Sequence, residues 1–185
     1  MLNAFLDGDD ARAEQASSAL IGLGADAIPA LLELTRLPHS DSRWLALRTL
    51  AHSPLLQIEW LIPFLDDPAP EVRQCAALGL GSKPDERATQ ALVGALSDRD
   101  GMVCSLAVKA LIAIGKPAVP SLIEELKIAS PSARIHALRA LAEIRDHPVI
   151  PAMMQVMEED SALLQYWAKE GLERLGLDMV YLKPV

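Results

Sequence analysis

Apolar residues recur along this chain with the 3.6-residue period of an α-helix, and the pattern itself repeats about every 30 residues. One ladder of leucines is spaced by 30 or 31 residues, and each leucine has an alanine four residues before it. The leucines are Leu20, Leu50, Leu80, Leu111, Leu141 and Leu172. The alanines are Ala16, Ala46, Ala76, Ala107, Ala137 and Ala168. We expect these residues to form the buried stripe of a helix that we call helix A.

A second ladder with the same spacing predicts a shorter helix B after each helix A. Its anchors are Leu31, Leu61, Leu92, Leu122 and Met153. Proline stands two residues before three of these anchors, in a first helical turn where its missing N–H costs no hydrogen bond; these are Pro29, Pro120 and Pro151. Glycine follows three of the A helices, as it often does at a helix C-terminus; these are Gly24, Gly115 and Gly176. Turns rich in Asp, Pro and Ser, such as SDRDG (97–101), supply N-caps for the next helix A.

This pattern predicts an all-α fold, an α-solenoid with a right-handed superhelix of five helix pairs and a C-terminal capping helix. One helix pair cannot bury its apolar face alone, so successive pairs must stack. The repeats are expected at about 9–37, 39–67, 69–98, 99–128 and 130–159, and the cap at 161–177. We expect one domain over 1–185, with stub-like ends at Met1–Leu6 and Asp178–Val185.

Composition supports helices and excludes several functional classes. The chain has 31 Leu and 28 Ala among 185 residues and only 4% aromatic residues, which favours helix over strand. Its net charge of −8 argues against nucleic-acid binding and against a polybasic membrane surface. There is no membrane-length apolar run, no signal-peptide pattern and no CxxC pair. We therefore expect a cytoplasmic protein that binds no membrane, no nucleic acid and no cofactor.

Three segments resemble HEAT-like repeats: DPAPEVRQCAALGLG (67–81), VCSLAVKALIAIGKPAVPSLIEEL (103–126) and SARIHALRALAEI…VIPAMMQVM (132–157). The short period and the IG-x-PAVP-x-LI string are similar to the bacterial subclass first noted in phycobilisome lyase proteins. The resemblance covers about residues 9–177. It implies a solenoid whose B helices line a concave face, and it raises three enzymatic alternatives.

Each enzymatic alternative lacks its signature in this sequence. HEAT-like hydroxylases carry repeated His-Glu dipeptides for a di-iron site, and no His-Glu dipeptide occurs here. HEAT-like alkylpurine DNA glycosylases use a basic concave face, whereas the corresponding positions here are apolar or acidic. Bilin lyases attach chromophores to partner cysteines, and no bilin pocket is recognisable. None of the four histidines has metal-ligand spacing, so we expect no metal site.

Arginine recurs seven residues before the helix A anchor, at Arg43, Arg73 and Arg134. Such a row either captures an anion such as phosphate or pairs with acidic residues between repeats. The sequence favours the second, with Asp66, Asp67 or Asp98 as partners; Ala13, Cys104 and Gln165 interrupt the row. We expect Cys75 and Cys104 to be buried small apolar residues.

The candidate binding surface is the outward side of the B helices, for which we count positions −1, +2 and +3 from each anchor. The expected partner-binding residues are Ala30, Leu34, Trp60, Pro63, Phe64, Ala91, Ala95, Glu124 and Glu125. Trp60 and Phe64 would form an apolar ridge beside small residues, which is typical of interfaces. Alternatively, Pro63 starts this helix late and turns Trp60 inward. Trp44, Tyr166 and Trp167 stand early in A helices and either are exposed or cap the core.

The sequence therefore predicts a non-enzymatic interaction or scaffold module that binds a protein or peptide on its concave helix-B face. The alternative is a bilin-lyase-like enzyme subunit or a chromophore-handling accessory protein. The partner and the oligomeric state stay open.

Overall fold

The computed structural model describes residues 10–159 and 161–177, and all regular elements within these ranges are helical. The predicted all-α solenoid is confirmed, and its superhelical sense stays a prediction. The chain divides into two compact units, Met1–Lys83 and Pro84–Val185, which we describe separately. This division does not test the prediction, made from the sequence, that the chain forms one domain. The stub-like ends Met1–Leu6 and Asp178–Val185 lie outside the described residues.

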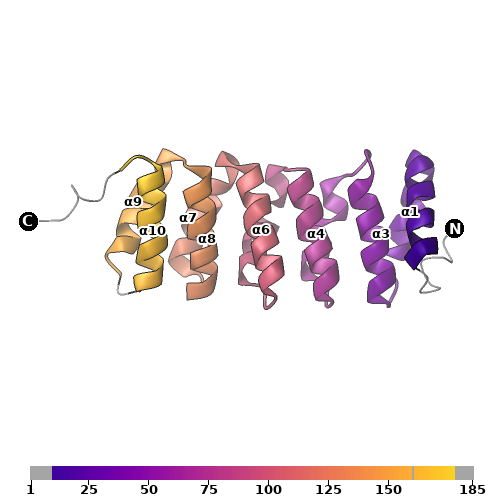
Figure 1. Ribbon diagram of the computed structural model, residues 1–185, viewed down its shortest axis with the longest axis horizontal. Coiled ribbons are helices and arrows are strands. Elements are labelled where there is room, and N and C mark those ends of the chain that lie inside the picture. Colours follow the sequence, from indigo (N-terminus) through magenta and orange to yellow (C-terminus); the bar gives the residue numbers. More distant parts are fainter. Residues whose placement is uncertain (1–9, 160, 178–185) are drawn as a thin grey trace, which may run out of the picture. The chain divides into compact units, whose positions relative to one another are not determined.

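In the first unit, three A helices stand side by side, with α3 packed against both neighbours (Figure 1). They are α1 (Asp10–Gly22), α3 (Ser40–His52) and α4 (Pro70–Ser82). The B elements of this unit are the 3-10 turn η2 (Gly24–Ala27) leading into α2 (Ile28–Leu34), and the 3-10 helices η3 (Ile58–Trp60) and η4 (Ile62–Asp66).

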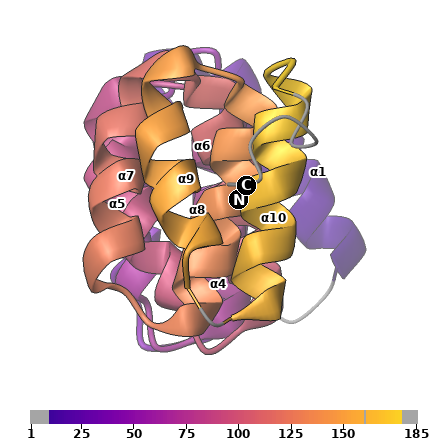
Figure 2. The same cartoon turned by 90° about the vertical axis from the view of Figure 1, so that its left-hand side faces the viewer.

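In the second unit, the A helices form one layer and the B helices form another (Figure 2). The A helices are α6 (Gly101–Ile114), α8 (Pro131–Ile144) and α10 (Ala162–Arg174). The B helices are α5 (Thr89–Gly94), α7 (Val119–Ile128) and α9 (Ile150–Met157). A short 3-10 turn precedes each of them, at η5 (Glu86–Ala88), η7 (Lys116–Ala118) and η8 (His147–Val149), and η6 (Ala95–Ser97) follows α5.

The second B element is not an α-helix. Pro63 stands two residues after the anchor Leu61, where an α-helix would need its N–H for a hydrogen bond to residue 59. Proline also disfavours helical backbone at the preceding residue. The segment therefore folds as two 3-10 helices that meet at Leu61. The alternative that Pro63 starts this helix late is therefore wrong: the element already begins at Ile58, and it is broken at Leu61.

Both ladders form the core. All leucines of the helix A ladder and all alanines four residues before them are buried. The residue just before the anchor is small for a steric reason: a Cβ on Gly79 would lie 2.7 Å from Leu61 Cδ1 and 3.1 Å from Ala51 Cβ. Small side chains thus let each helix A approach its neighbours closely.

The helix ends follow the predicted turn chemistry. Gly24, Gly115 and Gly176 have positive φ angles of 61°, 76° and 81°, which favour glycine. The side chain of Asp100 accepts from the backbone N–H groups of Met102 and Val103 at the start of α6. In the same way, the Ser130 side chain accepts from the Ala133 N–H at the start of α8, and the Ser161 side chain accepts from the Leu164 N–H at the start of α10. 

The C-terminal helix α10 carries an exposed charged residue at one position where the other two A helices of the second unit carry a buried apolar residue. Position −3 of helix A is buried Val108 in α6 and buried Leu138 in α8, but it is exposed Lys169 in α10. Lys169 pairs with Glu173 at 3.6 Å on the same helix.

Candidate functional site

The outward side of the B elements, which we call the B face, consists of positions −2 and +2 from each anchor. An α-helix turns about 100° per residue, so these positions lie opposite the anchor, whereas position +3 lies about 60° from it. Every residue at positions −2 and +2 is exposed: Pro29, Glu33, Glu59, Pro63, Gln90, Gly94, Pro120, Glu124, Pro151 and Gln155.

The sequence-based assignment of position +3 to the outward face was wrong for Leu34 and Ala95. Both are buried, with 7% exposure each, because this position points toward the anchor side of the helix. The other predicted residues reach the surface to different degrees. Pro63 and Glu124 are exposed, and Ala30, Trp60, Phe64, Ala91 and Glu125 are half-buried. Their role in partner binding stays a prediction.

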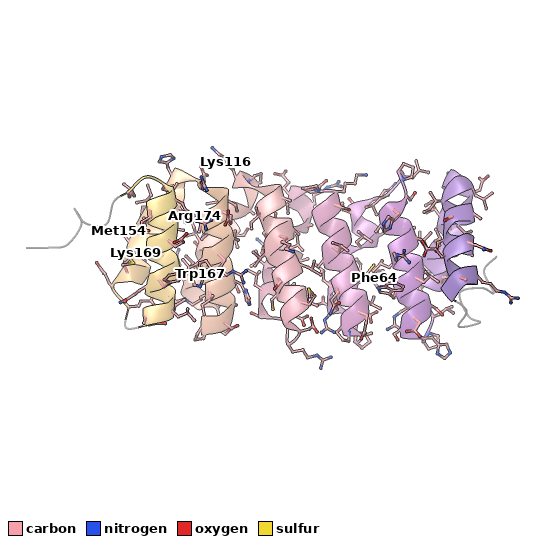
Figure 3. All side chains as sticks on the ribbon, in the orientation of Figure 1. Phe64, Lys116, Met154, Trp167, Lys169 and Arg174 are labelled. Carbon is pink, nitrogen blue, oxygen red and sulfur yellow. The ribbon has the colours of Figure 1, made fainter. Side chains whose placement is uncertain are left out.

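Trp60 is part core and part surface. It is half-buried and packs against the hydrophobic cluster of the first unit, which includes Leu31 and Leu50. Phe64, labelled in Figure 3, is half-buried on η4. The aromatic ridge predicted from the sequence is therefore a surface that also contributes to packing, and the inward turn of Trp60 is realised in part.

A groove of about 220 Å³ lies between α7 and α9 on the B face of the second unit. Its lining combines four apolar and four polar side chains: Ile123, Leu126, Lys127, Arg134, Ala152, Gln155, Val156 and Glu159. Lys127 Nζ also pairs with Glu124 at 2.7 Å, so one predicted surface residue borders the groove. Burial raises the pKa of the adjacent Glu125 carboxyl.

The arginine row is structural in the first unit. Arg43 donates from Nε and Nη2 to the Asp67 carboxylate at 2.8 and 2.7 Å, and both side chains are largely buried. Its Nη1 donates to the carbonyls of Leu37 and Pro38 at 3.0 and 2.7 Å. Burial alone would raise the pKa of Asp67, but the hydrogen bonds from Arg43 and the Ala69 N–H, with the arginine charges, lower it. The predicted pairing of the arginine row with an acidic residue between repeats is confirmed for Arg43 and Asp67.

Other residues at position −7 also reach back to the preceding turn. Arg73 Nη1 donates to the carbonyl of Asp67 at 2.8 Å. Cys104 Sγ donates to the carbonyl of Asp98 at 3.2 Å, and Gln165 Nε2 donates to the carbonyl of Glu159. The residues that interrupt the arginine row in sequence thus satisfy the same kind of backbone acceptor.

Arg134 differs from Arg43 although it occupies the same repeat position. Its Nη2 pairs with Glu159, an acidic partner that the sequence did not identify. Its Nε is buried and has no hydrogen-bond partner among the described residues. Its Nη1 makes no hydrogen bond to the described residues and is not among the buried atoms, so Arg134 brings one available N–H donor group to the groove, whereas Arg43 uses all three of its nitrogens.

The cysteines and histidines form no reactive constellation in the described part of the chain. Cys75 and Cys104 are buried, as predicted. Burial raises the pKa of Cys75 to about 12, and burial also raises the pKa of Cys104. Burial and the Arg139 charge lower the pKa of His136. Within residues 10–159 and 161–177, no group of three or more His, Cys, Asp and Glu side chains is placed to hold a metal ion.

In the described ranges, no single helix has the length and apolar character to cross a membrane. Only the pair Gly101–Ile114 and Lys116–Ile128, bent by 116°, meets the length and composition test jointly.

Two family models match the chain. The model for HEAT repeats matches residues 58–126, and the model for the PBS lyase HEAT-like repeat matches residues 133–159. The chain is a HEAT-like repeat protein. No curated protein sequence matches it.

Solved structures support this assignment. The complex of CpcE and CpcF of phycocyanin lyase from Nostoc sp. PCC7120 has a chain that is 27% identical, with a TM-score of 0.57, covering 75% of this chain and 94% of that chain. The archaeal HEAT-like repeats protein from Thermococcus onnurineus NA1 is 15% identical, with a TM-score of 0.59, covering 89% of this chain and 76% of that chain. At that identity the archaeal protein shows the fold alone.

The sequence did not reveal the α7/α9 groove of this HEAT-like repeat protein. The prediction centred on the aromatic residues of the second repeat, whereas the α7/α9 groove lies in the last two helix pairs. One signal was available: Arg134 continues the arginine row, and the turn at the end of its repeat carries Glu158 and Glu159, whereas the corresponding turn near Arg43 carries Asp66 and Asp67.

Proposed function

We propose that this HEAT-like repeat protein is a non-enzymatic interaction module that binds a protein or peptide segment on its B face. The observation that carries the proposal is the α7/α9 groove, with apolar walls and hydrogen-bonding side chains that have capacity left over. The predicted residues Glu124 and Glu125 stand on α7 beside it.

The size of the groove suits a peptide better than a metabolite. Pockets for small molecules typically measure about 300–1,000 Å³ and enclose most of the ligand. A groove of about 220 Å³ instead accommodates one or two side chains of a larger partner. Ile123 and Ala152, both half-buried, supply the apolar contacts for such a side chain.

The polar lining suits a peptide main chain. Arg134 retains N–H donors, and the Gln155 side chain is exposed and makes no hydrogen bond to the described residues. An amide side chain both donates and accepts, so Gln155 can pair with a backbone N–H and C=O, while Arg134 donates to a carbonyl. An extended segment with an apolar side chain matches this set of groups.

The absence of enzymatic activity is part of the proposal. Burial of both cysteines and the raised pKa of Cys75, about 12, keep that thiol protonated near neutral pH, which disfavours a cysteine nucleophile. The alternative, a lyase-like subunit, draws on the 27% identical structure from phycocyanin lyase. It predicts that an added bilin changes its absorbance on binding and is transferred to an apoprotein, and neither change is expected from an interaction module.

The test is affinity capture from the source cell's extract, read by mass spectrometry, with three versions of the protein. Ala152→Trp places a large side chain in the groove, and Ala113→Trp makes the same change at an exposed position of the A helix α6, outside the groove and outside the B elements. We expect one partner to be captured by the wild type and by Ala113→Trp and to be lost with Ala152→Trp. Circular dichroism must show that both variants are folded. Equal capture by all three folded proteins would refute the groove as the site.

A further inference from the structure

A second surface lies on the opposite layer of the second unit, where α6, α8 and α10 stand side by side (Figure 1). We define the A patch by six residues: Met102, Lys109, Arg139, Leu163, Tyr166 and Trp167. Met102, Leu163 and Tyr166 are each more than half exposed, at 57%, 53% and 56%. Leu163 and Tyr166 stand three residues apart on one face of α10, and Met102 lies on α6, on the other side of α8. Large apolar and aromatic side chains exposed close together, as Leu163 and Tyr166 are, are typical of interfaces rather than of free surface.

The aromatic part of the patch is ordered by contacts between its members. The Tyr166 and Trp167 rings meet edge to face, with centroids 5.4 Å apart and an interplanar angle of 80°. The guanidinium carbon of Arg139 lies 5.5 Å from the centroid of the Trp167 ring, which Figure 3 labels. Tyr, Trp and Arg are the residues most enriched among those that dominate binding energy in interfaces. Because they already hold one another, little side-chain entropy remains to be lost on binding.

The charge of the patch is opposite to that of the whole protein. Lys109 and Arg139 occupy the same repeat position in α6 and α8, and neither forms an ion pair with a carboxylate of the described residues. The sequence of α6 contains no acidic residue. The three carboxylates of α8 and α10 are already engaged: Arg174 binds Glu143 and Glu170, and Lys169 binds Glu173.

We propose that the A patch is a second interaction surface, which binds an acidic protein segment that also carries apolar side chains. Carboxylates of the segment would neutralise Lys109 and Arg139, and its apolar side chains would cover Tyr166 and Leu163. This surface is separate from the groove and would let the protein hold two partners at once.

An acidic protein segment fits better than a nucleic acid. Nucleic-acid affinity comes mainly from many phosphate contacts, commonly about 6–10, and the patch offers two unpaired cations. The net charge of −8 would repel a long polyanion, whereas a short segment touches only the patch.

The test uses a fluorescein-labelled peptide in which Glu alternates with Leu and Trp, and a counterpart with Gln in place of Glu. Fluorescence anisotropy is measured with wild type, Arg139→Gln, Tyr166→Ala and Lys116→Gln. Lys116, also labelled in Figure 3, is an exposed lysine of the same unit outside the patch, so Lys116→Gln controls for the loss of one charge. Arg139 makes no hydrogen bond to the described residues, so its replacement is expected to leave the fold intact, which circular dichroism checks.

We expect the acidic peptide to bind to wild type. Its affinity should be about tenfold weaker for Arg139→Gln and for Tyr166→Ala, and unchanged for Lys116→Gln. The Gln peptide should bind wild type more weakly by a similar factor, and Ala152→Trp should keep full affinity because the groove is not involved. Failure of wild type to bind the acidic peptide, equal affinity for both peptides, or unchanged affinity in both patch variants would overturn the proposal. Tighter binding of a single-stranded oligonucleotide than of the acidic peptide would also overturn it and assign the patch to nucleic acid.

Discussion

Replacement of Asp67 by alanine tests the buried ion pair between Arg43 and Asp67 in the first unit. The Asp67 carboxylate accepts two hydrogen bonds from Arg43 and one from the Ala69 N–H at 2.9 Å, with only 6% of its side chain exposed. Asp67→Ala leaves the Arg43 guanidinium buried without its counter-charge. Breaking a buried pair from one side typically costs about 3–5 kcal/mol, a large part of the stability of a small domain.

Urea unfolding followed by circular dichroism measures this loss, and hydrogen exchange of the α3 and α4 amides locates it. The matched control is Glu33→Ala, which removes the acidic partner of Arg36 from an exposed pair of 2.6 Å. Exposed pairs contribute about 0–1 kcal/mol, so the control should be nearly as stable as wild type. If Asp67→Ala is destabilised no more than Glu33→Ala, the reasoning about the buried pair is refuted.

The same pair predicts a pH dependence. Because folding lowers the pKa of Asp67, its contribution is fully present above the unfolded-state pKa, near 3.9, and is lost as the pH falls through the folded-state value. The stability difference between wild type and Asp67→Ala should therefore be full at neutral pH and shrink below about pH 4. A difference that grows on acidification would contradict the assigned direction.

Three further predictions concern packing and reactivity. Gly79→Ala should lower the free energy of unfolding by about 1–3 kcal/mol in a thermal or urea melt, because the new Cβ meets Leu61 and Ala51. The control Gly94→Ala should be tolerated, since a Cβ there has nothing within 4 Å. Equal stability of the two variants would argue against the close approach. Ala107→Leu should cost about 1–3 kcal/mol because Ala107 is fully buried, and an unchanged melting temperature would contradict the alanine ladder. Iodoacetamide at mildly alkaline pH should leave Cys75 unmodified in the folded protein and modify it in urea, since burial raises its pKa to about 12; rapid labelling of the folded protein would show that the thiol is accessible.

The fold was predictable because its determinants are local and repeated. The ladder of small and large residues specifies helix A, and the positive-φ glycines specify where it ends, so Leu111, Ala107 and Gly115 could each be placed from spacing alone. The second B element shows the limit of this reasoning. Pro63 signalled a disturbance, but the sequence did not predict its form, two 3-10 helices that meet at Leu61.

The candidate sites were less predictable because they depend on pairs of residues from different repeats. Periodicity placed the outward side of the B helices approximately, and the error at Leu34 and Ala95 came from assigning position +3 to it. The spare donors of Arg134 follow from the geometry of its pairing with Glu159, which spacing does not specify. The contact between Arg139 and Trp167 joins two repeats in the same way.

The central claim is that a partner segment occupies the α7/α9 groove. The most direct measurement is photo-crosslinking in the source cell's extract with p-benzoylphenylalanine in place of Gln155, compared with the same probe in place of Gly94. Both positions are exposed at +2 of a B helix, but only Gln155 lines the groove. The account predicts a specific protein crosslinked from position 155 and absent from position 94. The same crosslinked proteins from both positions, or none from position 155, would contradict it.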